Sequence, residues 1–121
     1  MTNLEGLSDE QLAVISKACE LLARLQMGQL EELVGLFERL PIEDHQELVA
    51  VLTGLKPLIT KLSSSQHLGI NHALVPDMAR NAFDIHQTIM RHWQQKSHLV
   101  GTHHVAPPRQ YGTSPLPKIR D

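Results

Sequence analysis

The sequence contains eight histidines, the side chain best suited to ligating a metal or moving a proton near neutral pH. Two ligands on one helix must lie three or four residues apart, because only those positions share a face. His86 and His92 are six residues apart in a predicted helix, so their side chains leave it on separate faces. Four others lie in predicted irregular segments: His67, His72, His103 and His104. This spacing predicts no bound metal, while the loop histidines leave a small hydrolase as one alternative.

The single cysteine, Cys19, is the only other obvious nucleophile. It falls inside an apolar helical period, where a cysteine is most simply a small core residue. The serines at positions 63–65 lack a G-x-S-x-G motif, and no glycine-rich phosphate loop follows a predicted strand. These residues therefore indicate neither covalent catalysis nor a cofactor.

Four polar residues form what we call the polar ladder: Arg80, Asp84, Gln87 and Arg91. At about 100° per residue they fall within a band of roughly 60° on one side of a predicted helix. One interpretation is a solvated helix surface with an Arg80–Asp84 pair at four-residue spacing. The other is a strip of arginine, acid and amide that grips a phosphate or another subunit.

The opposite side of the same helix carries an apolar stripe of Ala79, Ala82, Phe83, His86, Ile89, Met90 and Trp93. This stripe predicts a core face. His86 lies in its middle, so we expect this histidine to be buried with one hydrogen-bond partner.

The helices that must position these groups are marked by capping residues and apolar periodicity. Ser8 with Gln11 forms a capping box ahead of an apolar period at three- and four-residue steps. The period continues to Leu40, but Gly28 either bends one helix or admits a close neighbour, and both options stay open. Pro41 starts another helical stretch, in which Pro57 is expected to cause a kink or a break. The last helix is predicted over residues 76–96.

Residues 63–74 read as a polar loop, and the four prolines after residue 106 exclude regular structure there. The expected fold is all-α: a small bundle of about four helices, a polar loop before the last one, and an extended Pro-rich C-terminal arm. We assign a helical domain to residues 1–97 and the arm to residues 98–121. By composition the arm is disordered unless something holds it, and a partner subunit would serve.

The composition limits the partners. A length of 121 residues is that of one domain, and a net charge of -2 gives no long-range attraction to nucleic acid or anionic lipid. No apolar run approaches the roughly 18 to 20 residues that span a bilayer. The beginning of the sequence has no basic region followed by an apolar stretch, so a cytoplasmic location is expected.

Two segments, RLQMGQLEEL (residues 24–33) and LGINHALVPDMARNAFDIHQTIMRH (residues 68–92), together resemble a group of small bacteriophage proteins. Those proteins pair an M-G-Q-x-E-E segment with a G-I loop and a V-P-x-x-A-R-x-A-x-D-x-x-Q helix. The likeness covers about half of the chain, excludes the arm and brings no catalytic motif. It implies a setting in the host cytoplasm, where small phage proteins block a defence protein or sequester its nucleotide signal. It also draws attention to the matching positions, Gly28 among them.

The first functional hypothesis is a non-enzymatic binding protein, assembled as a homo-oligomer, that holds an anionic, nucleotide-like ligand. The expected ligand-binding residues are Arg80, Asp84, Gln87, Arg91, Gly69, Gln29 and Glu32. The alternatives are an inhibitor that docks on a host protein and, with less support, the hydrolase based on loop histidines.

Overall fold

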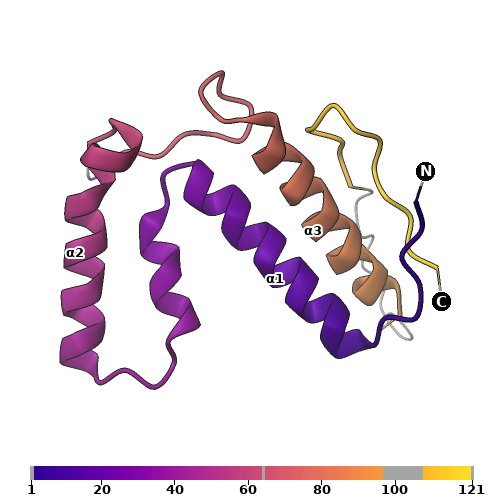
Figure 1. Ribbon diagram of the computed structural model, residues 1–121, viewed down its shortest axis with the longest axis horizontal. Helices are drawn as coiled ribbons and strands as arrows, with labels where there is room; N and C mark the ends of the chain where they lie inside the picture. Colours follow the sequence, from indigo (N-terminus) through magenta and orange to yellow (C-terminus); the bar gives the residue numbers. More distant parts are fainter. Residues whose placement is uncertain (1, 64, 97–107, 121) are drawn as a thin grey trace.

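The computed structural model describes residues 2–63, 65–96 and 108–120, and within them the chain is a small all-α bundle, as predicted. Three α-helices and one 3₁₀-helix follow one another along the chain (Figure 1). They are α1 (Asp9–Gln26), η1 (Leu30–Leu36), α2 (Ile42–Thr60) and α3 (Asp77–Lys96). None of these helices is long and apolar enough to cross a membrane.

The start of α1 confirms the predicted capping box. The Ser8 hydroxyl accepts the Gln11 backbone N–H at 3.1 Å, and the Gln11 side chain accepts the Ser8 N–H at 2.8 Å. Two N–H groups that the first helical turn leaves unsatisfied thereby gain partners.

Gly28 separates two helices instead of bending one. Its φ of +89° lies in the left-handed region, and a Cβ at this position would lie 2.8 Å from Leu62 Cδ1. Of the two explanations offered by the sequence, the close neighbour applies, and the turn also needs glycine's backbone freedom. The adjacent Met27 carbonyl oxygen accepts the Leu68 N–H at 2.7 Å, which ties this turn to the polar loop.

The expectation that Pro57 interrupts α2 is wrong, because the helix runs through it to Thr60. Pro57 lies in the last turn, so its missing N–H removes only one backbone bond, the one to Thr53. The Lys61 N–H then donates to the Pro57 carbonyl oxygen at 3.1 Å, and Lys61 ends the helix with a φ of +62°.

α1 and α3 lie side by side and run in opposite directions (Figure 1). Ala23 of α1 and Ala79 of α3 are fully buried, and such small side chains let two helix backbones approach closely. The other buried apolar residues belong to η1, to α3 and to the segment just before α3: Leu30, Val34, Val75, Ala82 and Ile89. Met90, expected in the core stripe, is exposed. α2 packs differently, since among the described elements it contacts η1 alone.

Cys19 on α1 is half-buried, and its burial raises the pKa of the thiol. We therefore expect iodoacetamide to alkylate it several-fold more slowly in the folded chain than in the denatured chain at pH 8. Because folding favours the protonated thiol, its contribution to stability should decline as the pH rises above the ordinary thiol pKa. Intact-mass measurements at successive times give the alkylation rate in each state and test the expected difference. Equal rates in the two states would contradict the burial of this thiol.

Candidate functional site on the polar face of α3

The polar ladder lies on the side of α3 that is covered by the C-terminal arm of the same chain. Residues 108–120 run along α3 on the side away from α1 (Figure 1). The arm is extended, as expected, and no regular secondary structure is assigned to its described part. The chain's own helix thus holds the arm that we expected a partner subunit to hold.

Asp84 is the centre of this contact. Although the sequence places it on a solvated face, only 2 % of this residue is exposed. Its carboxylate accepts the Tyr111 N–H at 3.0 and 3.1 Å and the Gly112 N–H at 2.8 Å. The Gln87 side-chain amide donates to the same carboxylate at 3.0 Å. A buried carboxylate needs such donors to offset its desolvation, and the arm backbone supplies them.

Gln87 and two further α3 residues extend the contact along the arm. Gln87 accepts the Arg109 N–H at 3.1 Å and donates to the Arg109 carbonyl oxygen. Asp77 accepts the Thr113 N–H at 3.1 Å, and Asn81 accepts the Ser114 N–H at 3.4 Å. Side chains of α3 between Asp77 and Gln87 therefore bind the arm through the arm's backbone N–H groups.

The sequence of the arm explains why this stretch binds. Pro108 and Pro115 have no N–H group, and between them residues 109–114 form an uninterrupted run of backbone donors. Five of these N–H groups meet side-chain oxygens of α3. The Tyr111 ring adds an edge-to-face contact with Phe83, at 5.6 Å between centroids.

The Arg80 side chain contacts the polar loop instead of the arm. Its guanidinium donates to the His72 carbonyl oxygen at 2.7 Å, and this fastens the start of α3 to the loop that contains Gly69. The Arg80–Asp84 pair suggested by their spacing is replaced by these two separate contacts, one to the loop and one to the arm.

Gln29 and Glu32 gather around a different arginine, Arg24 of α1. The Arg24 guanidinium donates to the Gln29 side-chain oxygen at 3.0 Å and lies 3.6 Å from the carboxylates of Glu20 and Glu32. Apart from Arg91, the expected site residues thus divide into three groups: the arm-binding pair of Asp84 and Gln87, the contact of Arg80 with the loop that contains Gly69, and this Arg24 cluster.

Arg91 lines a shallow pocket of about 210 Å³ between the second half of α3 and the arm. Its polar walls come from α3 and its apolar walls from the arm: Thr88, Arg91, His92, Gln95, Pro108, Leu116, Pro117 and Ile119. Its volume is below the roughly 300 Å³ of small-molecule pockets, so it fits a phosphate or a similar fragment rather than a whole nucleotide.

His86 bridges α1 and α3, with two partners instead of the one expected. Its Nδ1 lies 2.8 Å from the hydroxyl of Ser16, and its Nε2 lies 2.9 Å from the carboxylate of Glu20. The connectivity is that of a hydroxyl, an imidazole and an acid in a catalytic triad. Ser16, however, is buried within α1, where neighbouring N–H groups are committed to the helix and cannot form an oxyanion hole. We interpret these residues as a polar bridge that sets the register of the two helices.

The loop histidines occupy separate surroundings. His67 and His72 are both exposed, and His72 Nδ1 accepts the Leu74 N–H at 3.1 Å. His103 and His104 lie outside the described residues. In the part of the chain that the structure describes, no three histidine, cysteine, aspartate or glutamate side chains come close enough together to hold a metal ion.

Sequence reasoning missed Asp77 and Asn81, which belong to the arm contact as fully as Asp84 and Gln87. A signal was present, because positions 77, 81, 84 and 88 of α3 follow the three- and four-residue spacing of one helix face and all are polar. Ser16 carried no signal, since its partner His86 lies 70 residues away.

Comparisons with protein-family models, curated proteins and solved structures give no match to this chain. The functional argument therefore depends on this chain's own surfaces.

Proposed function

We propose that this chain is a non-enzymatic binding protein that acts through protein–protein contacts made by its α2–η1 half. The observation that carries the proposal is an apolar face, which we define by eight large side chains whose exposed fractions run from 36 % to 74 %. They are Leu36, Phe37, Leu40, Ile42, Val51, Leu55, Leu58 and Ile59. Exposed large apolar side chains in this number on two packed elements are typical of interaction sites, because soluble monomers rarely leave large apolar patches in water.

The geometry around Phe37 gives this face a place for a partner side chain. Residues 36–40 line an open hollow of about 420 Å³ in which apolar walls stand beside the charged Glu38 and Arg39. Apolar anchors surrounded by charged residues are the usual composition of a protein interface. The bacteriophage resemblance suggests a specific form of this proposal, in which the partner is a host defence protein.

A pair of matched variants tests the proposal. Leu58 and Leu74 are 72 % and 73 % exposed, but only Leu58 belongs to the apolar face. Tagged wild-type protein, Leu58→Lys and Leu74→Lys would be isolated from cells that also contain untagged chain, and the retained proteins quantified by mass spectrometry. We expect the wild type and Leu74→Lys to retain the same protein, whether a different one or the untagged copy, and Leu58→Lys to lose at least tenfold of it. Identical retention by all three would overturn the proposal.

A second candidate function is the capture of an anionic, nucleotide-like ligand by one of its phosphate groups, which is the part that matches the size of the Arg91 pocket. Arg91, His92 and Gln95 place a guanidinium, an imidazole and an amide around one hollow, a set suited to phosphate. Calorimetry with cyclic and ADP-ribose-type nucleotides tests this candidate, with Arg91→Ala compared against Arg39→Ala. Binding that Arg91→Ala abolishes would support it, whereas the absence of heat with every nucleotide would exclude it. A nucleotide converted to product over time would revive the hydrolase alternative.

A further inference from the structure

Resting on the proposed protein–protein function, we propose that the partner of α2 is a second copy of this chain, packed antiparallel along α2. The spacing of apolar residues on α2 is the first support. Leu48, Val51, Leu55 and Leu58 follow alternating steps of three and four residues, which is the pattern of a helix that packs along another helix.

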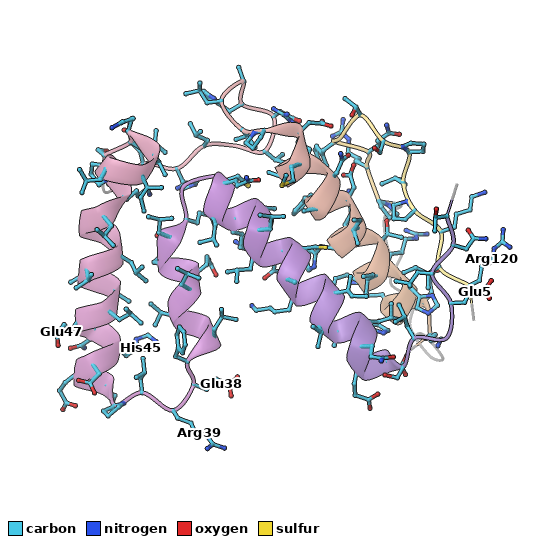
Figure 2. The ribbon with its side chains drawn as sticks, viewed as in Figure 1. Glu5, Glu38, Arg39, His45, Glu47 and Arg120 are labelled. Atoms are coloured by element: carbon cyan, nitrogen blue, oxygen red, sulfur yellow. The ribbon has the colours of Figure 1, made fainter. Side chains whose placement is uncertain are left out.

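Among the described elements, only one side of α2 packs against another part of the chain. η1 covers the side of α2 that carries Lys56, which is 2 % exposed, together with half-buried Leu52. The residues that we call the seam lie on another side of the helix and are exposed: Val51, Leu55, Leu58 and Ile59. Figure 2 shows Glu47 pointing away from η1 while His45 points toward it, so the outer side of α2 carries an acid at its beginning. A helix that is apolar on two sides needs a second neighbour.

The charges along α2 determine the direction of that neighbour. Glu43, Asp44 and Glu47 occupy the first two turns, no acid follows before the end of the helix, and Lys61 stands at its C-cap. Two copies packed parallel would place acid against acid. Packed antiparallel, each acidic start meets the Lys61 end of the other helix, and the two helix dipoles also oppose each other favourably.

A two-fold axis level with Thr53 satisfies both patterns at once. It sets Val51 across from Leu55 of the second copy and Leu48 across from Leu58 of the second copy, so that the apolar residues meet along the seam. Asp44 then comes level with Lys61 of the second copy, within one residue. The same surface is thus complementary to itself, which is the requirement for a two-fold interface between identical chains. A partner of different sequence would not need this symmetry.

The position of the hollow lined by residues 36–40 agrees with this arrangement. It directly precedes the acidic start of α2 (Figure 1), so an antiparallel α2 brings its own Leu58 and Ile59 to that end of the molecule. The two most exposed residues of the seam on one copy, Leu58 and Ile59, would then lie close to the hollow on the other.

The mass of the full chain in solution gives the first test. Light scattering after size exclusion should give twice the chain mass of 13.6 kDa for the wild type and for Leu74→Lys, and the single mass for Leu58→Lys. Circular dichroism should show equal helicity in all three, because both leucines are exposed. A wild-type monomer at every concentration, or a dimer that Leu58→Lys does not weaken, overturns the inference. A monomer that still retains a different protein through Leu58 would leave the proposed function standing.

A charge exchange tests the antiparallel direction. Asp44→Lys alone should bring two lysine side chains together at each end of the dimer interface, and Lys61→Glu alone should bring two acids together at each end. Each variant should therefore dimerise about three- to tenfold more weakly than the wild type at low salt. In a one-to-one mixture of the two variants, the mixed dimer again sets a lysine against an acid at each end, so the mixture should dimerise more strongly than either variant alone.

The double variant Asp44→Lys with Lys61→Glu restores an attractive pair at both ends, with the signs exchanged. We expect it to dimerise with wild-type affinity. In a parallel dimer residue 44 would face residue 44 and residue 61 would face residue 61, so the double variant would gain nothing over the single ones. A double variant no stronger than the single variants overturns the antiparallel arrangement.

Discussion

Replacing Asp84 with alanine is expected to release the C-terminal arm from α3 and to lower the free energy of unfolding by about 2 to 4 kcal/mol. The Asp84 carboxylate accepts two arm N–H groups and the Gln87 amide while it is 2 % exposed. Hydrogen bonds to a charged group contribute about 1.5 to 3 kcal/mol each. The loss is limited by the docking energy of the arm, because a released arm regains water as the partner of its N–H groups.

Two measurements test this expectation together. Denaturant unfolding gives the change in stability, and hydrogen exchange of residues 109–114 reports whether the arm has left. Asp84→Asn should have a smaller effect, since its carbonyl oxygen can still accept the Tyr111 and Gly112 N–H groups while its amide N–H opposes the Gln87 amide. Glu31→Ala, at an exposed acid of η1, should change the stability by less than about 0.5 kcal/mol. Unchanged exchange of the arm in Asp84→Ala would refute the contact described for Asp84.

Replacing Gly112 with alanine is expected to have the next largest effect, a loss of about 1 to 3 kcal/mol with displacement of the arm. A Cβ on Gly112 would lie 2.0 Å from Asn81 Oδ1 and 3.0 Å from the Asn81 backbone nitrogen. The Asn81 side chain could rotate away, but it would then give up its bonds to Ser114 and Asp77. Its backbone is held in α3 and cannot move, so the arm must.

Gly54 supplies the control for this glycine. It lies inside α2 with nothing near the position of an added Cβ. Gly54→Ala should therefore raise the free energy of unfolding by about 0.5 to 1 kcal/mol, since alanine is the better helix former. The two substitutions are chemically identical and should act with opposite sign. A Gly112→Ala protein as stable as the wild type, with a protected arm, would mean that the arm does not lie against Asn81.

The losses in the free energy of unfolding caused by the two arm variants should not be additive. Asp84→Ala and Gly112→Ala remove the same docking, so the double variant should lose little more than Asp84→Ala alone. Full additivity would indicate that one of the two acts elsewhere, for instance on α3 itself.

The arm contact changes how the polar ladder is understood. From the sequence, Arg80, Asp84, Gln87 and Arg91 form one strip for either solvent or a ligand. In the structure Asp84 and Gln87 bind the chain's own backbone, Arg80 binds the polar loop, and Arg91 borders a pocket. Any anionic ligand at this face would therefore meet Arg91 and the arm together. Releasing the arm by Asp84→Ala should weaken such binding as well.

The sequence by itself determined the elements of this protein. The capping box at Ser8, the apolar periods and the proline at position 76 predict the start of α1, the all-α class and the extent of α3, and these are confirmed. Such features depend on bonds and contacts between residues three or four positions apart, which a sequence displays directly.

Tertiary structure alone decided what covers each helix face. The bonds of Asp84 to the arm join residues 27 and 28 positions apart, and the Ser16–His86 bridge spans 70. The local sequence cannot distinguish an acid that binds N–H groups of a distant segment from an acid that is exposed to water. Helical periodicity gives the direction of a side chain, but it does not show which segment lies next to it. For the same reason the seam on α2 is visible as a pattern in the sequence, whereas its exposure follows only from the packing of η1 against another side of that helix.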